Sequence, residues 1–215
     1  MKENTREKLY EYAIRIADAV NYNNLGTVEF LVDADERIYF IEVNPRIQVE
    51  HTVTEMITGI DLIKTQLFIA SDYKLFDTEI GLGEQNAILK NGFAIQCRIT
   101  TEDPINNFKP DYGTLLTYRN ATGFGVRLDE GSTYPGMKIS PFFDSMLVKV
   151  STQGKSMDEA AQKMNRALRE FRIRGVKNNI QFLENLISNQ EFIEGKATVN
   201  FIQEHPELFQ FSERQ

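Results

Sequence analysis

Residues 42–50 read Glu-Val-Asn-Pro-Arg-Ile-Gln-Val-Glu, and this is the most informative stretch of the chain. In an extended segment, side chains alternate between two faces. One face would then be apolar, and the other would carry Glu42, Asn44, Arg46, Gln48 and Glu50. The polar side of an ordinary surface strand is mostly Lys, Thr, Ser and Glu, whereas every group here is a metal ligand, an anion-binding group or a candidate base. We therefore predict a strand that carries chemistry rather than a solvated surface strand.

A β-hairpin is predicted just before and into this stretch. Two runs typical of strands, residues 26–32 and 37–43, flank Asp33-Ala-Asp-Glu36, which is typical of a turn. Pairing Val32 with Arg37 gives the hairpin one fully apolar face. The opposite face is predicted to carry Thr27, Glu29, Leu31, Ile38, Phe40 and Glu42.

The same register places two carboxylates near each other. Glu29 falls diagonal to Glu42, roughly 7–8 Å away at the backbone. Two like charges at that spacing repel unless a cation lies between them. Carboxylate oxygens with Asn44 nearby suit Mg²⁺ or Mn²⁺ ions that hold phosphates. The alternative is a pair of solvent-facing glutamates on an exposed sheet face, and Asn44 and Arg46 on the same side argue against it.

The second half of the stretch offers an anion site and a base. Arg46 has the fork geometry to bind a small oxyanion such as bicarbonate or a carboxylate. Glu50 comes two positions after Gln48, beyond the cation ligands, where a base can meet a bound anion. His51 falls on the apolar side of the alternation, so we interpret it as a packed structural histidine.

Composition excludes several classes of protein. The chain has 215 residues, enough for one large domain or two small ones, with 41% hydrophobic and 26% charged residues. Its net charge of −7 argues against nucleic acid or an anionic membrane as the main partner. The single cysteine, Cys97, excludes an internal disulfide and favours a reducing compartment, so we expect a cytoplasmic protein. No segment has the length of a membrane span, and residues 1–20 do not form a signal peptide.

The rest of the sequence predicts an α+β fold with a domain break between residues 72 and 92. Helical spacing of apolar residues marks the helices, and β-rich runs bounded by turn residues mark the strands. Helices are expected at residues 4–20, 60–70, 156–171 and 178–188, and strands at residues 93–100, 113–119, 125–128 and 146–151.

With these motifs the sequence resembles the biotin carboxylase domain of biotin-dependent carboxylases, an ATP-grasp family. The resembling stretches span nearly the whole chain, at residues 26–31, 39–51, 53–59, 97–104, 123–127 and 144–145. The resemblance implies that residues 1–85 form the C-terminal part of an ATP-grasp subdomain, a helix plus antiparallel strands. Residues 86–215 would then form the biotin carboxylase C-terminal domain, an antiparallel sheet with helices.

The resemblance also implies a role for each candidate residue in the ATP- and bicarbonate-dependent carboxylation of biotin. Glu29, Glu42 and Asn44 would hold Mg²⁺ ions on ATP. Arg46 would orient bicarbonate, and Glu50 would remove its proton. The other implied contacts are Leu31 with adenine, Gln48 and the Val49 backbone with bicarbonate, and Arg98 with the oxygen of biotin, which is attached to a carrier domain outside this chain.

Arg98 and Asp144 each have an ordinary alternative. A cation beside the ureido oxygen of biotin would stabilise charge where it develops. Arg98 can equally be an edge-strand arginine paired with Glu102 or Asp103, and without the resemblance that interpretation is preferred. Asp144 either supports the biotin site or caps a turn.

Several details resemble pyruvate carboxylases more than acetyl-CoA carboxylase subunits, among them residues 139–145, 171–176 and 206–209. The expected reaction is then the first half-reaction in the conversion of pyruvate to oxaloacetate. The equivalent piece of an acyl-CoA carboxylase is the alternative. Arg172 and Arg174 lie where an anionic effector would bind, although a solvated helix terminus explains them as well.

Other parts of the family have no counterpart in the sequence. An ATP-grasp enzyme covers the phosphates with a Gly-rich loop and a Lys, and neither glycine pair, 81/83 or 123/125, is followed by such a Lys. We therefore expect a fragment that folds but does not turn over ATP. Its partners would be the rest of its own polypeptide: the N-terminal biotin carboxylase part, the carboxyltransferase and the biotin carrier.

A non-catalytic dimerisation module is the hypothesis from another class. The biotin carboxylase domains of the family pair through this C-terminal region, and Phe124 and Arg127 match positions near that interface. An exposed Phe with an Arg is typical of an interface core. We therefore expect a homo-oligomer that forms through these two residues.

Overall fold

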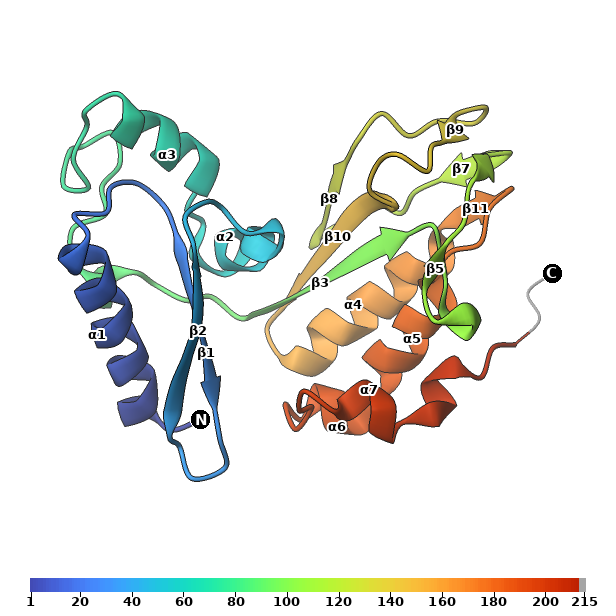
Figure 1. Ribbon diagram of the computed structural model, residues 1–215. Coiled ribbons are helices and arrows are strands. Elements are labelled where there is room, and N and C mark those ends of the chain that lie inside the picture. The colour runs from blue at the N-terminus through green and yellow to red at the C-terminus, as the bar shows by residue number, and fades with distance from the viewer. Residues whose placement is uncertain (213–215) are drawn as a thin grey trace. The chain divides into compact units, whose positions relative to one another are not determined.

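The computed structural model describes residues 1–212 and divides into two compact units. The first unit consists of residues 1–51 and 60–88, and the second of residues 52–59 with the chain from residue 89 onward. Figure 1 shows the elements of each unit along the chain. None of the helices among the described residues combines the length and the apolar character that crossing a membrane requires.

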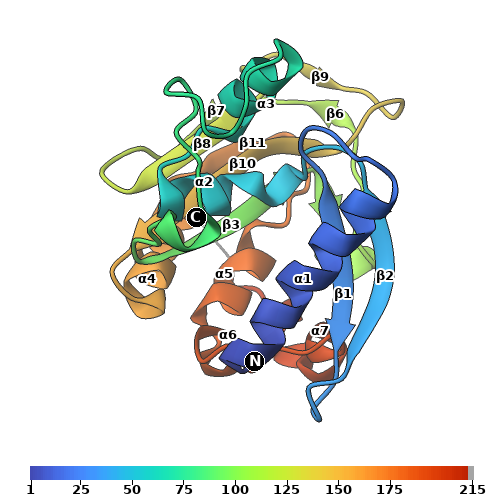
Figure 2. The ribbon, with the colours of Figure 1, turned by 90° about the vertical axis from the view of Figure 1, so that its left-hand side faces the viewer.

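The first unit is built on one helix and one hairpin. Helix α1 (Glu3–Ala19) lies alongside the antiparallel strands β1 (Thr27–Val32) and β2 (Ile38–Asn44), as Figures 1 and 2 show. The ring centroid of Tyr12 on α1 is 6.5 Å from that of Phe30 on β1, so apolar contact joins the two. The predicted helices at residues 4–20 and 60–70 are confirmed. The unit is completed by the 3-10 helix η1 (Val49–His51), helix α3 (Leu62–Ala70) and the 3-10 helix η2 (Gln85–Ala87).

The hairpin register differs from the predicted one. Val32 pairs with Ile38 rather than with Arg37, because Arg37 lies in the turn. One face of the hairpin is still fully apolar, but its members change: Phe40 now packs across from Phe30, with ring centroids 6.2 Å apart. The sequence allows both registers, since residues 38–41 are apolar or aromatic without alternation.

A β-bulge then alters the pairing near the predicted carboxylates. Phe30 pairs with Phe40, whereas Glu29 pairs with Glu42, so Ile41 is an extra residue on β2. Glu29 therefore lies directly opposite Glu42. The sequence had predicted a diagonal position, and that prediction is wrong. The two carboxylates are brought closer than expected, since directly opposed residues are the nearest cross-strand neighbours.

The second unit has a three-stranded antiparallel sheet at its centre. The strand order is β3 (Phe93–Thr100), β10 (Met146–Gly154), β8 (Val126–Glu130). One face of this sheet packs against helix α4 (Met157–Glu170), which in turn packs against α5 (Ile180–Ser188). The strands predicted at residues 93–100, 125–128 and 146–151 and the helices predicted at residues 156–171 and 178–188 are confirmed. The fully buried apolar side chains of this core include Ile99, Val148, Val150, Met164 and Leu168.

Short elements surround this core. The strand predicted at residues 113–119 is interrupted, because its two halves pair with different strands. The paired strands are β4 (Glu102–Asp103) with β5 (Lys109–Pro110), β6 (Gly113–Thr114) with β9 (Lys138–Ile139), and β7 (Thr117–Arg119) with β11 (Arg172–Arg174). The short helices are η3 (Pro104–Asn106), α6 (Gln190–Ile193), α7 (Phe201–Glu204) and η4 (Pro206–Phe209). The predicted α+β class is confirmed.

Helix α2 (Thr52–Thr58) is attached to the other face of the sheet by polar contacts. The Thr52 hydroxyl donates to Gln96 Oε1 at 2.6 Å and lies 2.7 Å from the Ser151 hydroxyl. Arg127 Nη1 donates to Glu55 Oε2 at 2.5 Å. Thr52 and Ser151 are fully buried, so α2 belongs to the second unit although it follows the first hairpin in sequence.

Candidate functional site

The predicted carboxylates face each other across the hairpin and share one amide. Glu29 on β1 pairs with Glu42 on β2, and Asn44 Nδ2 donates hydrogen bonds of 2.9 Å to Glu29 Oε1 and to Glu42 Oε1. Gln48 Nε2 donates to the same oxygen of Glu29 at 2.7 Å. Glu29 is half-buried and Glu42 is exposed. The structure therefore brings these predicted residues together in one polar cluster.

The donor set of this cluster fits a hard divalent cation. Its candidate ligands are carboxylate and amide oxygens, which Mg²⁺ and Mn²⁺ prefer. The Asn44 amide bridges the two carboxylates through its NH₂ group, and turning it over would present its oxygen to the same position. No three His, Cys, Asp or Glu side chains in the described part of the chain form a metal-binding group. The carboxylate pair would therefore depend on Asn44 as a third ligand.

The polar stretch is not extended along its whole length, so this part of the prediction is wrong. Strand β2 ends at Asn44, because Pro45 has no N–H to donate to a strand ladder. The backbone N–H of Arg46 instead donates to the Asn44 carbonyl at 2.8 Å, and the chain then enters η1, which carries Glu50. Strict alternation between two faces therefore stops at Asn44.

Arg46 reaches the cluster through its side chain instead. Its Nη1 donates to Gln48 Oε1 at 3.2 Å and to the Ile47 carbonyl at 3.0 Å, and its Nη2 donates to Asn44 Oδ1 at 3.4 Å. The guanidinium is exposed and has five N–H donors, so donors are left over for an oxyanion. An anion bound there would lie beside the carboxylate cluster.

The other candidates of the first unit are placed as follows. Leu31 lies two residues from Glu29 on the same hairpin face and is 45% exposed. Glu50 is exposed on η1, and Val49 beside it is half-buried. His51 is half-buried, and its Nδ1 lies 2.6 Å from the Gln48 carbonyl oxygen, which supports its interpretation as a structural residue.

Arg98 and Asp144 belong to the second unit. Arg98 is exposed on β3, opposite Lys149 on β10. Asp144 is exposed in the loop that precedes β10, and its Oδ1 accepts a 2.9 Å bond from the backbone N–H of Met146. Asp144 therefore does cap a turn, and this leaves its second carboxylate oxygen available for another contact.

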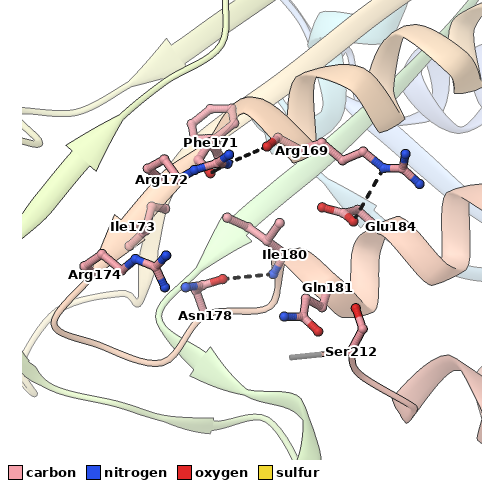
Figure 3. Close-up of a pocket in the computed structure, with 10 residues that line it drawn as sticks. All are labelled: Arg169, Phe171, Arg172, Ile173, Arg174, Asn178, Ile180, Gln181, Glu184 and Ser212. Carbon is pink, nitrogen blue, oxygen red and sulfur yellow. Dashed lines mark hydrogen bonds and ion pairs between the residues drawn. The ribbon is translucent and has the colours of Figure 1, made fainter. Parts of the chain in front are cut away.

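A basic cavity of about 620 Å³ lies in the second unit, where β11 leads towards α5 (Figure 3). Its lining includes Arg169, Arg172, Arg174, Asn178 and Gln181. Sequence analysis singled out Arg172 and Arg174 and missed the others. Arg169 falls on the solvent side of the amphipathic helix pattern, and the amides of Asn178 and Gln181 carry no sequence signal of their own.

Two family models match separate parts of the chain. Residues 96–204 match the biotin carboxylase C-terminal domain, and residues 1–78 match the ATP binding domain of the carbamoyl-phosphate synthase L chain. The chain is 55% identical over 204 residues to the pyruvate carboxylase of Staphylococcus aureus, a match that covers 95% of this chain. The chain spans only 18% of the length of that relative.

Two solved structures are similar over almost the whole chain. A variant of Rhizobium etli pyruvate carboxylase, solved with the allosteric activator acetyl coenzyme A, matches with a TM-score of 0.94 and 50% identity, over 100% of this chain and 21% of that one. The biotin carboxylase domain dimer of Hydrogenobacter thermophilus 2-oxoglutarate carboxylase, solved with MgADP, ADP and bicarbonate, matches with a TM-score of 0.91 and 38% identity. That match covers 99% of this chain and 46% of that one.

Proposed function

Because the chain belongs to the family of the biotin carboxylase C-terminal domain, which matches residues 96–204, we propose that it contributes to the ATP- and bicarbonate-dependent carboxylation of biotin. The observation that carries this proposal is the amide-bridged pair Glu29–Asn44–Glu42 with Arg46 beside it. This cluster combines oxygen ligands for a phosphate-bound cation with a cation for a small oxyanion. The relative that was solved with MgADP and bicarbonate supports the proposal.

In the first step the hairpin binds the nucleotide. Glu29, Glu42 and Asn44 would hold Mg²⁺ or Mn²⁺ for the ATP phosphates, and the exposed Leu31 would line the adenine pocket. A cation held there would supply positive charge that neutralises the phosphates and makes the terminal phosphorus more open to attack. The half-buried position of Glu29 strengthens its attraction to a cation, because burial lowers the local dielectric.

In the second step bicarbonate becomes a nucleophile. Arg46 binds its oxygens with the donors that Asn44, Ile47 and Gln48 leave over, and Gln48 and the Val49 backbone complete the pocket. Glu50 takes the bicarbonate proton, since bicarbonate is a poor nucleophile until it is deprotonated. Its oxygen then attacks the terminal phosphorus, ADP leaves, and carboxyphosphate forms.

In the third step the carboxyl group reaches biotin. Carboxyphosphate splits into CO₂ and phosphate, the phosphate takes the proton from the ureido nitrogen of biotin, and this nitrogen attacks CO₂. Arg98 stabilises the negative charge that develops on the ureido oxygen. Asp144 supports the biotin-binding site with Oδ2, the carboxylate oxygen that does not accept the turn hydrogen bond from Met146.

The test is a chimera in which this chain replaces the matching segment of the Staphylococcus aureus pyruvate carboxylase. Glu50→Gln in the chimera should lower biotin carboxylation by about 10²–10⁴-fold, because it removes the base. It should leave the fold intact, since Glu50 is exposed. Glu79→Gln, at another exposed glutamate, is the matched control and should retain activity. Full activity of Glu50→Gln would overturn the assignment of the base.

For the parent polypeptide we propose pyruvate as the final acceptor and the cytoplasm as the location. The 55% identity to a pyruvate carboxylase supports the acceptor, and an acyl-CoA carboxylase is the alternative. Residues 1–85 would supply the ATP, metal and bicarbonate contacts, and residues 86–215 the biotin contacts. Sequencing the reading frame on both sides of the chain checks the acceptor, since each parent has its own carboxyltransferase.

Dimerisation is the second candidate function, and the exposure of Phe124 favours it. Phe124 is 95% exposed, which is unusual for a large apolar side chain, and Lys163 Nζ lies 5.5 Å above its ring. Arg127, by contrast, is bonded to Glu55 and Asp129 within the unit. Phe124→Ala should therefore weaken self-association of the chimera in sedimentation experiments without changing biotin carboxylation. Unchanged association would remove Phe124 from the proposed interface.

The basic cavity supports an anionic effector as a further part of the proposal. Arg169, Arg172 and Arg174 line a cavity of about 620 Å³, and a 50% identical relative was solved with acetyl coenzyme A as allosteric activator. Arg174→Gln in the chimera should raise the acetyl coenzyme A concentration needed for half-maximal binding. Equal affinity in the variant would exclude Arg174 from effector binding.

A further inference from the structure

The end of strand β3 is held by three polar side chains, Glu102, Ser145 and Asn179, which we name the β3 frame. We propose that the β3 frame positions Arg98 and Asp144 relative to each other and so sets how well biotin is bound. This inference rests on the proposed function, because it assigns both residues to the biotin side. The frame, Arg98 and Asp144 all belong to the second unit.

Asn179 holds the backbone that carries Arg98. Strand β3 is the outer strand of its sheet, so its outward N–H and C=O groups have no neighbouring strand. Asn179 Nδ2 donates to the Arg98 carbonyl at 2.9 Å, and Asn179 Oδ1 accepts from the Thr100 N–H at 3.0 Å. Asn179 is 6% exposed, and its own N–H also donates to the Thr100 carbonyl at 3.3 Å. A buried amide therefore takes the place of the missing strand at the level of Arg98.

Glu102 and Ser145 attach the Asp144 loop to the same strand end. Ser145 Oγ donates to Glu102 Oε1 at 2.6 Å, and Thr100 Oγ1 donates to Glu102 Oε2 at 3.1 Å. The Ser145 carbonyl also accepts from the buried N–H of Thr101 at 2.8 Å. An ionised carboxylate only accepts hydrogen bonds, so both hydroxyls must donate to it, and such charge-assisted bonds are the stronger kind.

The loop before Ser145 has little packing of its own. Phe142 is 88% exposed and Phe143 is 81% exposed, so neither ring holds the loop to the core. Asp144 bonds locally to Met146 N, which shapes the turn but does not fix its position on the sheet. The bonds of Ser145 to Glu102 and Thr101, next to the pairing of Met146 with Thr100, thus attach Asp144 to the end of β3.

Comparing two activities of the chimera distinguishes a variant that misplaces Arg98 and Asp144 from one that destabilises the fold. The bicarbonate-dependent ATP cleavage that proceeds without biotin uses residues of the first unit, whereas carboxylation of free biotin also needs Arg98 and Asp144. Ser145→Ala should lower kcat/KM for biotin by about 10- to 100-fold, since a small misplacement of a binding group has effects of this size. ATP cleavage without biotin should stay within about twofold. Ser145→Thr, which retains the hydroxyl, should restore biotin carboxylation.

Two further variants make the test specific to the frame. Ser140→Ala removes a hydroxyl of the same loop that bonds only to the Phe142 N–H, and it should leave both activities unchanged. Asn179→Asp keeps an acceptor for Thr100 N–H but loses the donor to the Arg98 carbonyl, so it should reproduce the Ser145→Ala result. Parallel loss of both activities in Ser145→Ala and Asn179→Asp, or no loss in either, would overturn the inference. If the unsubstituted chimera did not carboxylate biotin, the proposed function itself would fail.

Discussion

Asn44 is the single residue on which the candidate site depends most. Its amide bonds to both Glu29 and Glu42, which would otherwise be two opposed carboxylates with no shared donor. Asn44→Leu keeps the size of the side chain and removes its polar atoms. Since a hydrogen bond to a charged group contributes about 1.5–3 kcal/mol, we expect the Mg²⁺ concentration for half-maximal ATP cleavage by the chimera to rise about tenfold or more.

The control for this prediction is Asn23→Leu, at an exposed asparagine of the same unit that bonds only to its neighbour. It should leave the Mg²⁺ dependence unchanged. Equal Mg²⁺ dependence in Asn44→Leu and the unsubstituted chimera would show that the cluster is not a cation site.

We expect Arg127 to stabilise the folded state and not to take part in catalysis. It donates to Glu55, which is 8% exposed, and to Asp129, and these partners raise the pKa of its guanidinium, Asp129 most of all. Arg127→Met should lower the free energy of unfolding by about 1–3 kcal/mol, because a buried carboxylate loses a donor. Arg37→Met removes an exposed guanidinium from its ion pairs with Asp33 and Asp35 and should lower it by about 0–1 kcal/mol in the same urea titration. Equal effects of the two substitutions would contradict the account.

At the scale of single residues, the sequence predicted that polar side chains after the hairpin would cluster, but it did not predict the geometry of that cluster. Alternation predicted a shared side for Asn44, Arg46 and Gln48, although β2 ends at Asn44. They still meet, because long side chains with complementary donors and acceptors span the bend after Pro45. The contacts of Asn179 with β3 could not be predicted, since they join positions far apart in the sequence through one amide.

Among the elements, the hairpin turn responds to pH. The carboxylate of Asp33 accepts bonds from the Arg37 N–H at 2.9 Å and from Arg37 Nε at 2.8 Å. These bonds, that of the Arg37 backbone first, lower the pKa of Asp33 below its usual value. A lowered pKa means that the ionised form is stabilised in the folded state. This stabilisation is present above about pH 4 and is lost as the pH falls through the lowered pKa.

The free energy of unfolding of Asp33→Asn should therefore fall less steeply, as the solution is acidified, than that of the unsubstituted protein. Asparagine keeps an acceptor for the turn N–H groups but does not titrate. The measurement is the urea midpoint of each protein from about pH 5 down to about pH 2.5. Parallel curves for the two proteins would show that Asp33 is not linked to folding.

Truncation of a buried side chain on helix α4 should clearly destabilise the fold. Leu168 is fully buried in the core of the second unit, so Leu168→Ala should cost about 2–5 kcal/mol in the free energy of unfolding. Gln162→Ala changes an exposed position of the same helix and should stay within about 0.5 kcal/mol. Urea unfolding followed by circular dichroism compares the two. A loss for Leu168→Ala no larger than that for the control would mean that this face of α4 is not the core.

Elements with strong periodicity were predictable, and the hairpin register was not. Strand β3 alternates buried Ile95, Cys97 and Ile99 with polar neighbours, and its predicted limits are those observed. The hairpin has no such alternation between Ile38 and Ile41, so burial does not select one register from the sequence. The bulge at Ile41 depends on cross-strand pairing, which sequence patterns do not encode.

For the whole molecule, we propose that the first unit carries the ligands for nucleotide, cation and bicarbonate and that the second unit carries those for biotin. The sequence contains no Gly-rich loop followed by a phosphate-binding Lys. We therefore expect the purified chain of residues 1–215 to fold, with a cooperative unfolding transition, and to cleave no ATP in the presence of bicarbonate.

The most direct measurement is the incorporation of labelled bicarbonate into free biotin by the chimera, with MgATP, beside the purified chain alone. We expect ATP-dependent carboxybiotin formation by the chimera, its loss in Glu50→Gln, and none by the chain alone. A folded chimera that binds MgATP but forms no carboxybiotin, or one whose activity survives the loss of Glu29, Glu42 and Glu50, would contradict this expectation.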